Sequence, residues 1–227
     1  ARKEHGVEIK LEHIEPKDIE RQSMALIQAE LDHRHIHLDP MEAPIIRRCI
    51  HTSADFDYAE NLQFSDHAVE KMRAALAAGA LVVTDTEMAR AGIRKQALSA
   101  LGGDTRCFMA DPKVAIEAKK RGVTRAVISM EHAARIQDRP LIFAIGNAPT
   151  ALIELYRLIH DHGLHPAGII GVPVGFVNVV EAKELILSLA EETAPISEIP
   201  WIVARGRKGG SNIAACIVNA LLYGIHE

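Results

Sequence analysis

The chain has 227 residues, of which 48% are hydrophobic and 4% aromatic, and its formal net charge is −4. A mildly acidic chain with few aromatic rings lacks the basic field and stacking platform of a nucleic-acid-binding protein, so we expect no nucleic-acid partner. The length and apolar content predict one full core in a single domain, residues 1–227, although the length alone also allows two domains. We find no apolar run of bilayer-spanning length and no signal-peptide pattern, and we expect a cytoplasmic protein without a membrane partner.

The N-terminal part of the sequence predicts a first helix over residues 17–32. Apolar positions at helical spacing give it an inward face of Ile19, Leu26 and Ile27, and Ser23 interrupts that apolar stripe.

A histidine-rich link follows the first helix. His33, His35 and His37 alternate there, a spacing that suits metal ligands only on a strand, and no second ligand cluster accompanies them. We therefore predict a solvated link and no metal site.

A second helix is predicted to begin at Asp39, with Pro40 at its first position. Its apolar face comprises four residues: Ile45, Ile46, Cys49 and Ile50. Three basic side chains share another face, because positions three and four apart are neighbours on a helix: Arg47, Arg48 and His51. A third helix is predicted from Ser65 to about Gly79.

From residue 81 onward, short apolar strands alternate with helices. The strands are expected at 81–84, 105–110, 141–145, 167–170 and 201–204. This order predicts an α/β fold: a mostly parallel sheet flanked by helices on both faces, preceded by an N-terminal helical segment. Ligands bind such sheets beyond the carboxyl ends of the strands, which makes Thr86, Asn147 and the turn at 205–211 candidate binding residues.

The turn at 205–211 is basic and glycine-rich. Its sequence, RGRKGGS, places Arg205, Arg207 and Lys208 before a helix N-terminus, which suits an anionic ligand. It has neither the Walker A pattern nor GxGxxG, so a nucleotide or phosphosugar enzyme is disfavoured. The alternative interpretation is a helix entry that serves only packing.

His51 stands at the end of the second helix, beside two arginines. Imidazole gains and loses a proton near neutral pH, so this residue could donate a proton to a ligand. From the residues alone, a histidine that only caps the helix or has a structural role is the favoured explanation.

Five separated segments, in order, resemble one known family. They read IIRRCIHTSADFDYAENLQFS, LVVTDTEMARAGI, AIGNAPTAL, GVPVGFVNVVEAKE and GRKGGSNIAACIVNALLY. Together they are similar to the precorrin-8X methylmutases of cobalamin biosynthesis, and the resemblance runs from about Pro16 to Tyr223. The forms IHTSADF and GRKGGSN are most similar to the branch that acts on a cobalt-bearing substrate.

The resemblance implies an isomerase that moves a methyl group from C-11 to C-12 of a corrin precursor, (cobalt-)precorrin-8, by a 1,5-sigmatropic shift. It implies no cofactor. The family's catalytic histidine corresponds to His51, and its substrate-contacting serine and arginine correspond to Ser23 and Arg48. It also implies a homodimer with the site near the subunit interface. A non-catalytic carrier of tetrapyrroles is the alternative.

Such a substrate has an apolar macrocycle rimmed by carboxylates. Arginines and helix N-termini suit the rim, and the apolar side chains of Val172, Val174 and Phe176 suit the ring faces. A unimolecular shift needs orientation, one proton donor and an environment for developing charge, so no nucleophilic triad is expected.

Overall fold

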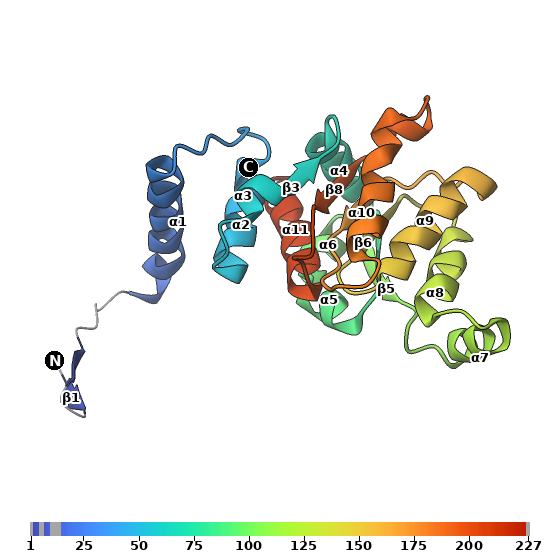
Figure 1. Ribbon diagram of the computed structural model, residues 1–227, viewed down its shortest axis with the longest axis horizontal. Helices are drawn as coiled ribbons and strands as arrows, with labels where there is room; N and C mark the ends of the chain where they lie inside the picture. Colours follow the sequence, from blue (N-terminus) through green and yellow to red (C-terminus); the bar gives the residue numbers. More distant parts are fainter. Residues whose placement is uncertain (1, 5–6, 10–14, 226–227) are drawn as a thin grey trace. The chain divides into compact units, whose positions relative to one another are not determined.

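The chain divides into two compact units in the computed structural model, Ala1–His37 and Leu38–Glu227 (Figure 1). The structure describes residues 2–4, 7–9 and 15–225. The expectation of one domain over residues 1–227 stays a prediction.

The first unit contains a small hairpin and one long helix. Strands β1 (Arg2–Glu4) and β2 (Val7–Ile9) pair antiparallel, and α1 runs over Pro16–His33, close to the predicted bounds. The predicted inward face is only partly right. Ile27 is buried and Ser23 half-buried, whereas Ile19 and Leu26 are 50% and 66% exposed.

The second unit is built on a six-stranded sheet of order β3-β8-β7-β6-β4-β5. Every neighbouring pair is parallel except β3 with β8, which confirms the predicted mostly parallel sheet. The strands are β3 (Leu62–Phe64), β4 (Leu81–Thr84), β5 (Asp104–Cys107), β6 (Leu141–Ile145), β7 (Gly168–Gly171) and β8 (Trp201–Ala204).

Helices cover both faces of this sheet, because side chains alternate between its faces and both sets are apolar. Phe143, Ile169 and Val203 point to the face covered by α8 (Arg125–Ala134), α9 (Pro149–His162) and α10 (Val179–Leu187). The opposite face packs against α4 (Ala68–Ala77) and α11 (Ser211–Tyr223), and α11 in turn contacts α2 (Ala43–Ser53) and α5 (Glu87–Gly92) (Figure 1).

Short elements complete the unit. They are α3 (Tyr58–Asn61), α6 (Lys95–Ala100), α7 (Pro112–Arg121) and two 3-10 turns at Ser188–Glu191 and Ile196–Glu198. No helix within the described residues is both long and apolar enough to cross a bilayer.

Two predicted helix starts were wrong. Asp39 and Pro40 lie in a turn, where the Asp39 carboxylate accepts the Met41 N–H at 2.8 Å, and α2 begins only at Ala43, with Pro44 in its first turn. Ser65 does not begin a helix either. Its hydroxyl accepts the Trp201 N–H at 2.9 Å and so ends β3, and α4 starts at Ala68.

Candidate functional site

Helix α11 carries a stripe of polar and reactive side chains along one face. Asn212, Cys216, Asn219 and Tyr223 follow one another at intervals of four, three and four residues, which aligns them on a helix. The other faces are buried, and α2 and α5 pack on either side of the stripe.

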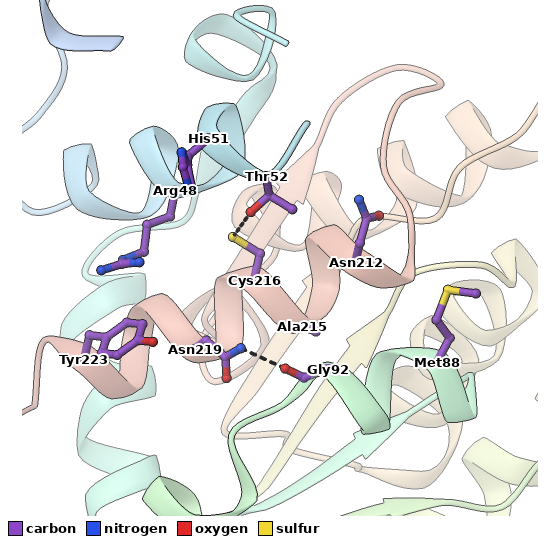
Figure 2. A pocket seen from close by; sticks show the side chains of 10 residues that line it. All are labelled: Arg48, His51, Thr52, Met88, Gly92, Asn212, Ala215, Cys216, Asn219 and Tyr223. Carbon is purple, nitrogen blue, oxygen red and sulfur yellow. Dashed lines mark hydrogen bonds between the residues drawn. The ribbon is translucent and has the colours of Figure 1, made fainter. Parts of the chain in front are cut away.

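A pocket of about 390 Å³ lies over this stripe (Figure 2). Helix α2 contributes Arg48, His51 and Thr52, and α5 contributes Met88 and Gly92. Arg48 and His51, the two residues of the second unit that the family resemblance singles out, therefore face one cavity. Arg47, which shares their helix in the sequence, is not among the lining residues.

The part of the pocket wall that α2 supplies is basic, and other parts of the lining are apolar. None of the described residues that line it is acidic, while Arg48 reaches across to Tyr223 and places its guanidinium carbon 4.2 Å from the ring centroid (Figure 2). Ala215 and the Met88 side chain, which is 71% exposed, supply apolar surface. This combination suits an apolar ligand that carries negative charge.

The thiol of Cys49 on α2 is hydrogen-bonded to the thiol of Cys216 on α11, which lines the pocket. The hydrogen bond between them raises the pKa of the buried Cys49 and lowers that of Cys216. Thr52 donates its hydroxyl to the Cys216 sulfur at 3.2 Å, which also lowers the Cys216 pKa, as does the charge of Arg48. All three cysteines are free thiols.

The carboxyl ends of the strands form a rigid cluster beside the pocket. Asp85, which directly follows β4, is buried and accepts three backbone N–H bonds, from Gly146 at 2.9 Å, Asn147 at 2.8 Å and Ala148 at 2.6 Å. Burial nonetheless raises the pKa of Asp85. The predicted residue Asn147 is thus held by its backbone, and its side chain is exposed.

Thr86 performs a structural task in the same cluster. Its hydroxyl accepts the Ala89 N–H at 3.0 Å, as an N-cap of α5, and is hydrogen-bonded to the Ser211 hydroxyl at 2.7 Å. Gly146 is required here because a Cβ at that position would lie 2.7 Å from the Ser211 Cα. Thr86 thereby fixes α5 against the start of α11, next to Asn212 at one end of the pocket.

The basic turn at 205–211 is largely neutralised by local carboxylates. Arg205 makes two bonds to Glu184, at 2.7 and 3.0 Å, and Lys208 bonds Asp55 at 2.6 Å and Asp57 at 2.5 Å. These bonds raise the pKa of Lys208 and lower that of Asp55. Arg205 and Lys208 therefore act first as structural ion pairs in this state.

Arg207 lies over the ring of Phe176, 5.5 Å from its centroid, and Phe176 is 83% exposed. The turn at 205–211 is hydrogen-bonded to the segment that follows β7, since the Gly210 N–H donates to the Val172 carbonyl at 2.9 Å. Val172 itself is fully buried, so it cannot face a macrocycle as the sequence suggested; Val174 remains half exposed.

Lys183 of α10 supports the basic turn from below. It is fully buried and donates to the carbonyls of Gly206 and Lys208 at 2.7 and 2.8 Å. Burial lowers its pKa to about 8, from the ordinary 10.5. A neutral amine keeps two N–H groups, which is enough for both carbonyls.

A pH-dependent stability follows from Lys183. Between pH 8 and 10.5 the unfolded chain holds a proton that the native state has released, so this group makes the free energy of unfolding rise with pH. We expect wild type to gain up to about 3 kcal/mol relative to Lys183→Met across that window. Urea unfolding at both ends of the window, with the exposed Lys95→Met as control, measures it; an equal difference at both pH values would contradict the assignment.

Ser23 lies on α1, in the first compact unit, and its role in the site stays a prediction. His33, His35 and His37 are exposed. Within the described part of the chain, no group of three or more His, Cys, Asp or Glu side chains could hold a metal ion.

Sequence reasoning missed most of the pocket floor. No local motif marks three of its residues, Cys216, Asn219 and Tyr223. The signal in the sequence was their helical spacing on a segment that is otherwise almost wholly apolar. Polar side chains aligned on one face of such a helix indicate that this face does not pack in the core.

Comparisons with known proteins agree over nearly the whole chain. The family profile described as Precorrin-8X methylmutase matches residues 18–224. A cobalt-precorrin-8 methylmutase from Salmonella typhimurium is 40% identical, covering 94% of this chain and 97% of its own, and one from Leptospira interrogans is 40% identical over 91% and 92%. A solved precorrin-8X methyl mutase from Thermus thermophilus aligns with a TM-score of 0.79 and 34% identity, covering 92% and 98%.

Proposed function

Because the chain belongs to the precorrin-8X methylmutase family, we propose that it is the isomerase that moves the C-11 methyl group of cobalt-precorrin-8 to C-12. The single observation that supports this most directly is the convergence of Arg48 and His51 on one pocket without acidic lining. The relatives are named as methylmutases, and nothing favours the tetrapyrrole-carrier alternative.

The residues of the pocket divide the work of a unimolecular shift. Arg48 holds a peripheral carboxylate, while Met88 and Ala215 lie against the macrocycle. His51 donates a proton to the conjugated ring, which withdraws electron density while the C-11–methyl bond breaks and the C-12–methyl bond forms. The proton returns to His51 when the product's conjugation is established, so no atom is gained or lost.

The proposal is tested by mixing the purified protein with cobalt-precorrin-8, or with its metal-free counterpart, and following the visible spectrum. We expect conversion of both, with a higher kcat/KM for the cobalt form. A spectral change on binding without conversion would favour the carrier. Ser23→Ala, measured beside wild type, tests whether the serine contributes to substrate affinity.

We further propose a cytoplasmic homodimer. The three free cysteines fit a reducing compartment such as the cytoplasm.

The pocket volume of about 390 Å³ is at the lower end of the range for ligand sites, so a large macrocycle would need a second surface, which a second subunit would provide. Phe176 and Val177 are 83% and 77% exposed and could supply one. Analytical ultracentrifugation should give twice the chain mass of 24.8 kDa, reduced in Phe176→Asp; a concentration-independent wild-type monomer would contradict the proposal.

A further inference from the structure

Two arginines from different elements meet at one ring of the pocket. The guanidinium carbon of Arg94 lies 5.0 Å from the Tyr223 ring centroid, and that of Arg48 lies 4.2 Å from it. Two guanidinium groups therefore share one aromatic ring, and each carries the fork of N–H donors that matches a carboxylate. Arg94 was predicted as a site residue neither from the sequence pattern nor from the family resemblance.

The position of Arg94 is fixed by its backbone. Asn219 of α11 accepts the Arg94 N–H at 2.9 Å. The same side chain donates to the Gly92 carbonyl at 2.9 Å (Figure 2). Ile93, between these two, is buried, and Gly92 packs so closely on α11 that a Cβ there would lie 2.8 Å from that of Ala215. The backbone of residues 92–94, before α6, is therefore held against α11. This fixes the position of the Arg94 Cα, from which the exposed side chain extends.

Among the described residues, no carboxylate pairs with the Arg94 guanidinium. Across residues 2–4, 7–9 and 15–225, the Arg94 side chain forms no ion pair, whereas the neighbouring Arg90 is paired with Glu87 at 3.1 Å. The described pocket lining is also free of acidic side chains.

We propose that Arg94, Arg48 and Tyr223 form a carboxylate subsite at the end of the pocket, with Arg94 as a specificity-determining residue. This deepens the proposed function and rests on it for the ligand's identity, an acidic side arm of a corrin precursor. A carboxylate between two guanidiniums accepts charge-assisted bonds from both, and the tyrosine ring keeps the two cations oriented.

The competing explanation is that these arginines only complement the C-terminal end of α11, where cations are favoured. That role predicts a lower melting temperature when Arg94 is removed and no change in ligand affinity. The two explanations therefore differ in a measurable way.

The experiment compares wild type, Arg94→Ala, Arg94→Lys and the matched control Arg90→Ala. The ligands are cobalt-precorrin-8 and the corrin polycarboxylate product, with a product analogue whose carboxylates are all amidated. We expect Arg94→Ala to weaken product affinity and raise KM by about 10- to 100-fold, with kcat changed less than about threefold. Arg94→Lys should recover part of the affinity, and the amide analogue should bind wild type and Arg94→Ala equally.

Equal product affinity in wild type and Arg94→Ala would overturn the subsite, whether or not the melting temperature falls. If wild type binds the product without converting substrate, and Arg94→Ala binds it more weakly, the subsite stands and the methylmutase proposal fails. If wild type binds no corrin polycarboxylate at all, both are overturned.

Discussion

Replacing His51 with alanine is expected to lower kcat by about 10²- to 10⁴-fold, the usual contribution of one general acid. The imidazole lies at the pocket rim, in the last turn of α2, on the helix face that also presents Arg48 and Thr52. Removing it deletes the proposed proton donor and leaves the Arg48–Tyr223 contact in place. Product affinity should therefore stay within about threefold of wild type, because the proposed charge-assisted contact between Arg48 and the ligand does not involve His51.

His162→Ala is the matched control, because His162 also lies in the last turn of a helix, α9, and is exposed. Any loss that comes from removing a histidine at a helix C-terminus will appear in both variants. Added imidazole should restore part of the turnover of His51→Ala and none of that of an inactive Arg48 variant. Steady-state kinetics decide the matter: wild-type kcat in His51→Ala would remove this residue from the mechanism.

Replacing Asp85 with alanine is expected to lower the free energy of unfolding by about 3–5 kcal/mol, because three buried amides lose their acceptor at once. For a chain of this size that corresponds to a fall in melting temperature of roughly 6–20 °C. The segment after β6 would also loosen beside Ser211, so the start of α11 should exchange its amide hydrogens faster.

Asp104→Ala serves as control, since Asp104 is exposed and accepts a single backbone bond, from Thr105 at 2.7 Å. It should cost under about 1 kcal/mol. Asp85→Asn, which keeps one oxygen acceptor and the side-chain volume, should fall between the two and provides a folded protein if Asp85→Ala proves insoluble. Equal urea midpoints for Asp85→Asn, Asp104→Ala and wild type would show that the three bonds carry little stability.

The alternation of strands and helices from residue 81 onward was determined by the sequence itself, whereas the short edge strand β3 (Leu62–Phe64) was not predicted. Strands such as Leu141–Ile145 and Trp201–Ala204 were predicted at their observed bounds, because a fully buried strand must be apolar on both faces and short. The buried face of α2 was also predicted residue by residue, since helical spacing depends only on local geometry. Family resemblance, carried by five motifs, supplied the activity.

Local patterns failed where a distant partner decided the outcome. Ser65 looks like a helix cap, and only the Trp201 amide, 136 residues away, makes it the end of a strand. The ion pairs of Arg205 and Lys208 were not predicted either, because only folding brings Glu184, Asp55 and Asp57 to them; their role in binding substrate stays a prediction. A charge pattern along the chain cannot reveal which opposite charges will be adjacent.

The pocket is the clearest case. The sequence by itself determined that Arg48 and His51 share a helix face, because they are three residues apart. Only the tertiary structure decided that this face lies opposite Tyr223 and Asn219, and that Arg94 arrives from a third element to the same ring. The physical reason is that the spacing of side chains along one helix is fixed by local backbone geometry. Contacts between helices depend instead on how the apolar faces of the sheet and of all its covering helices pack together.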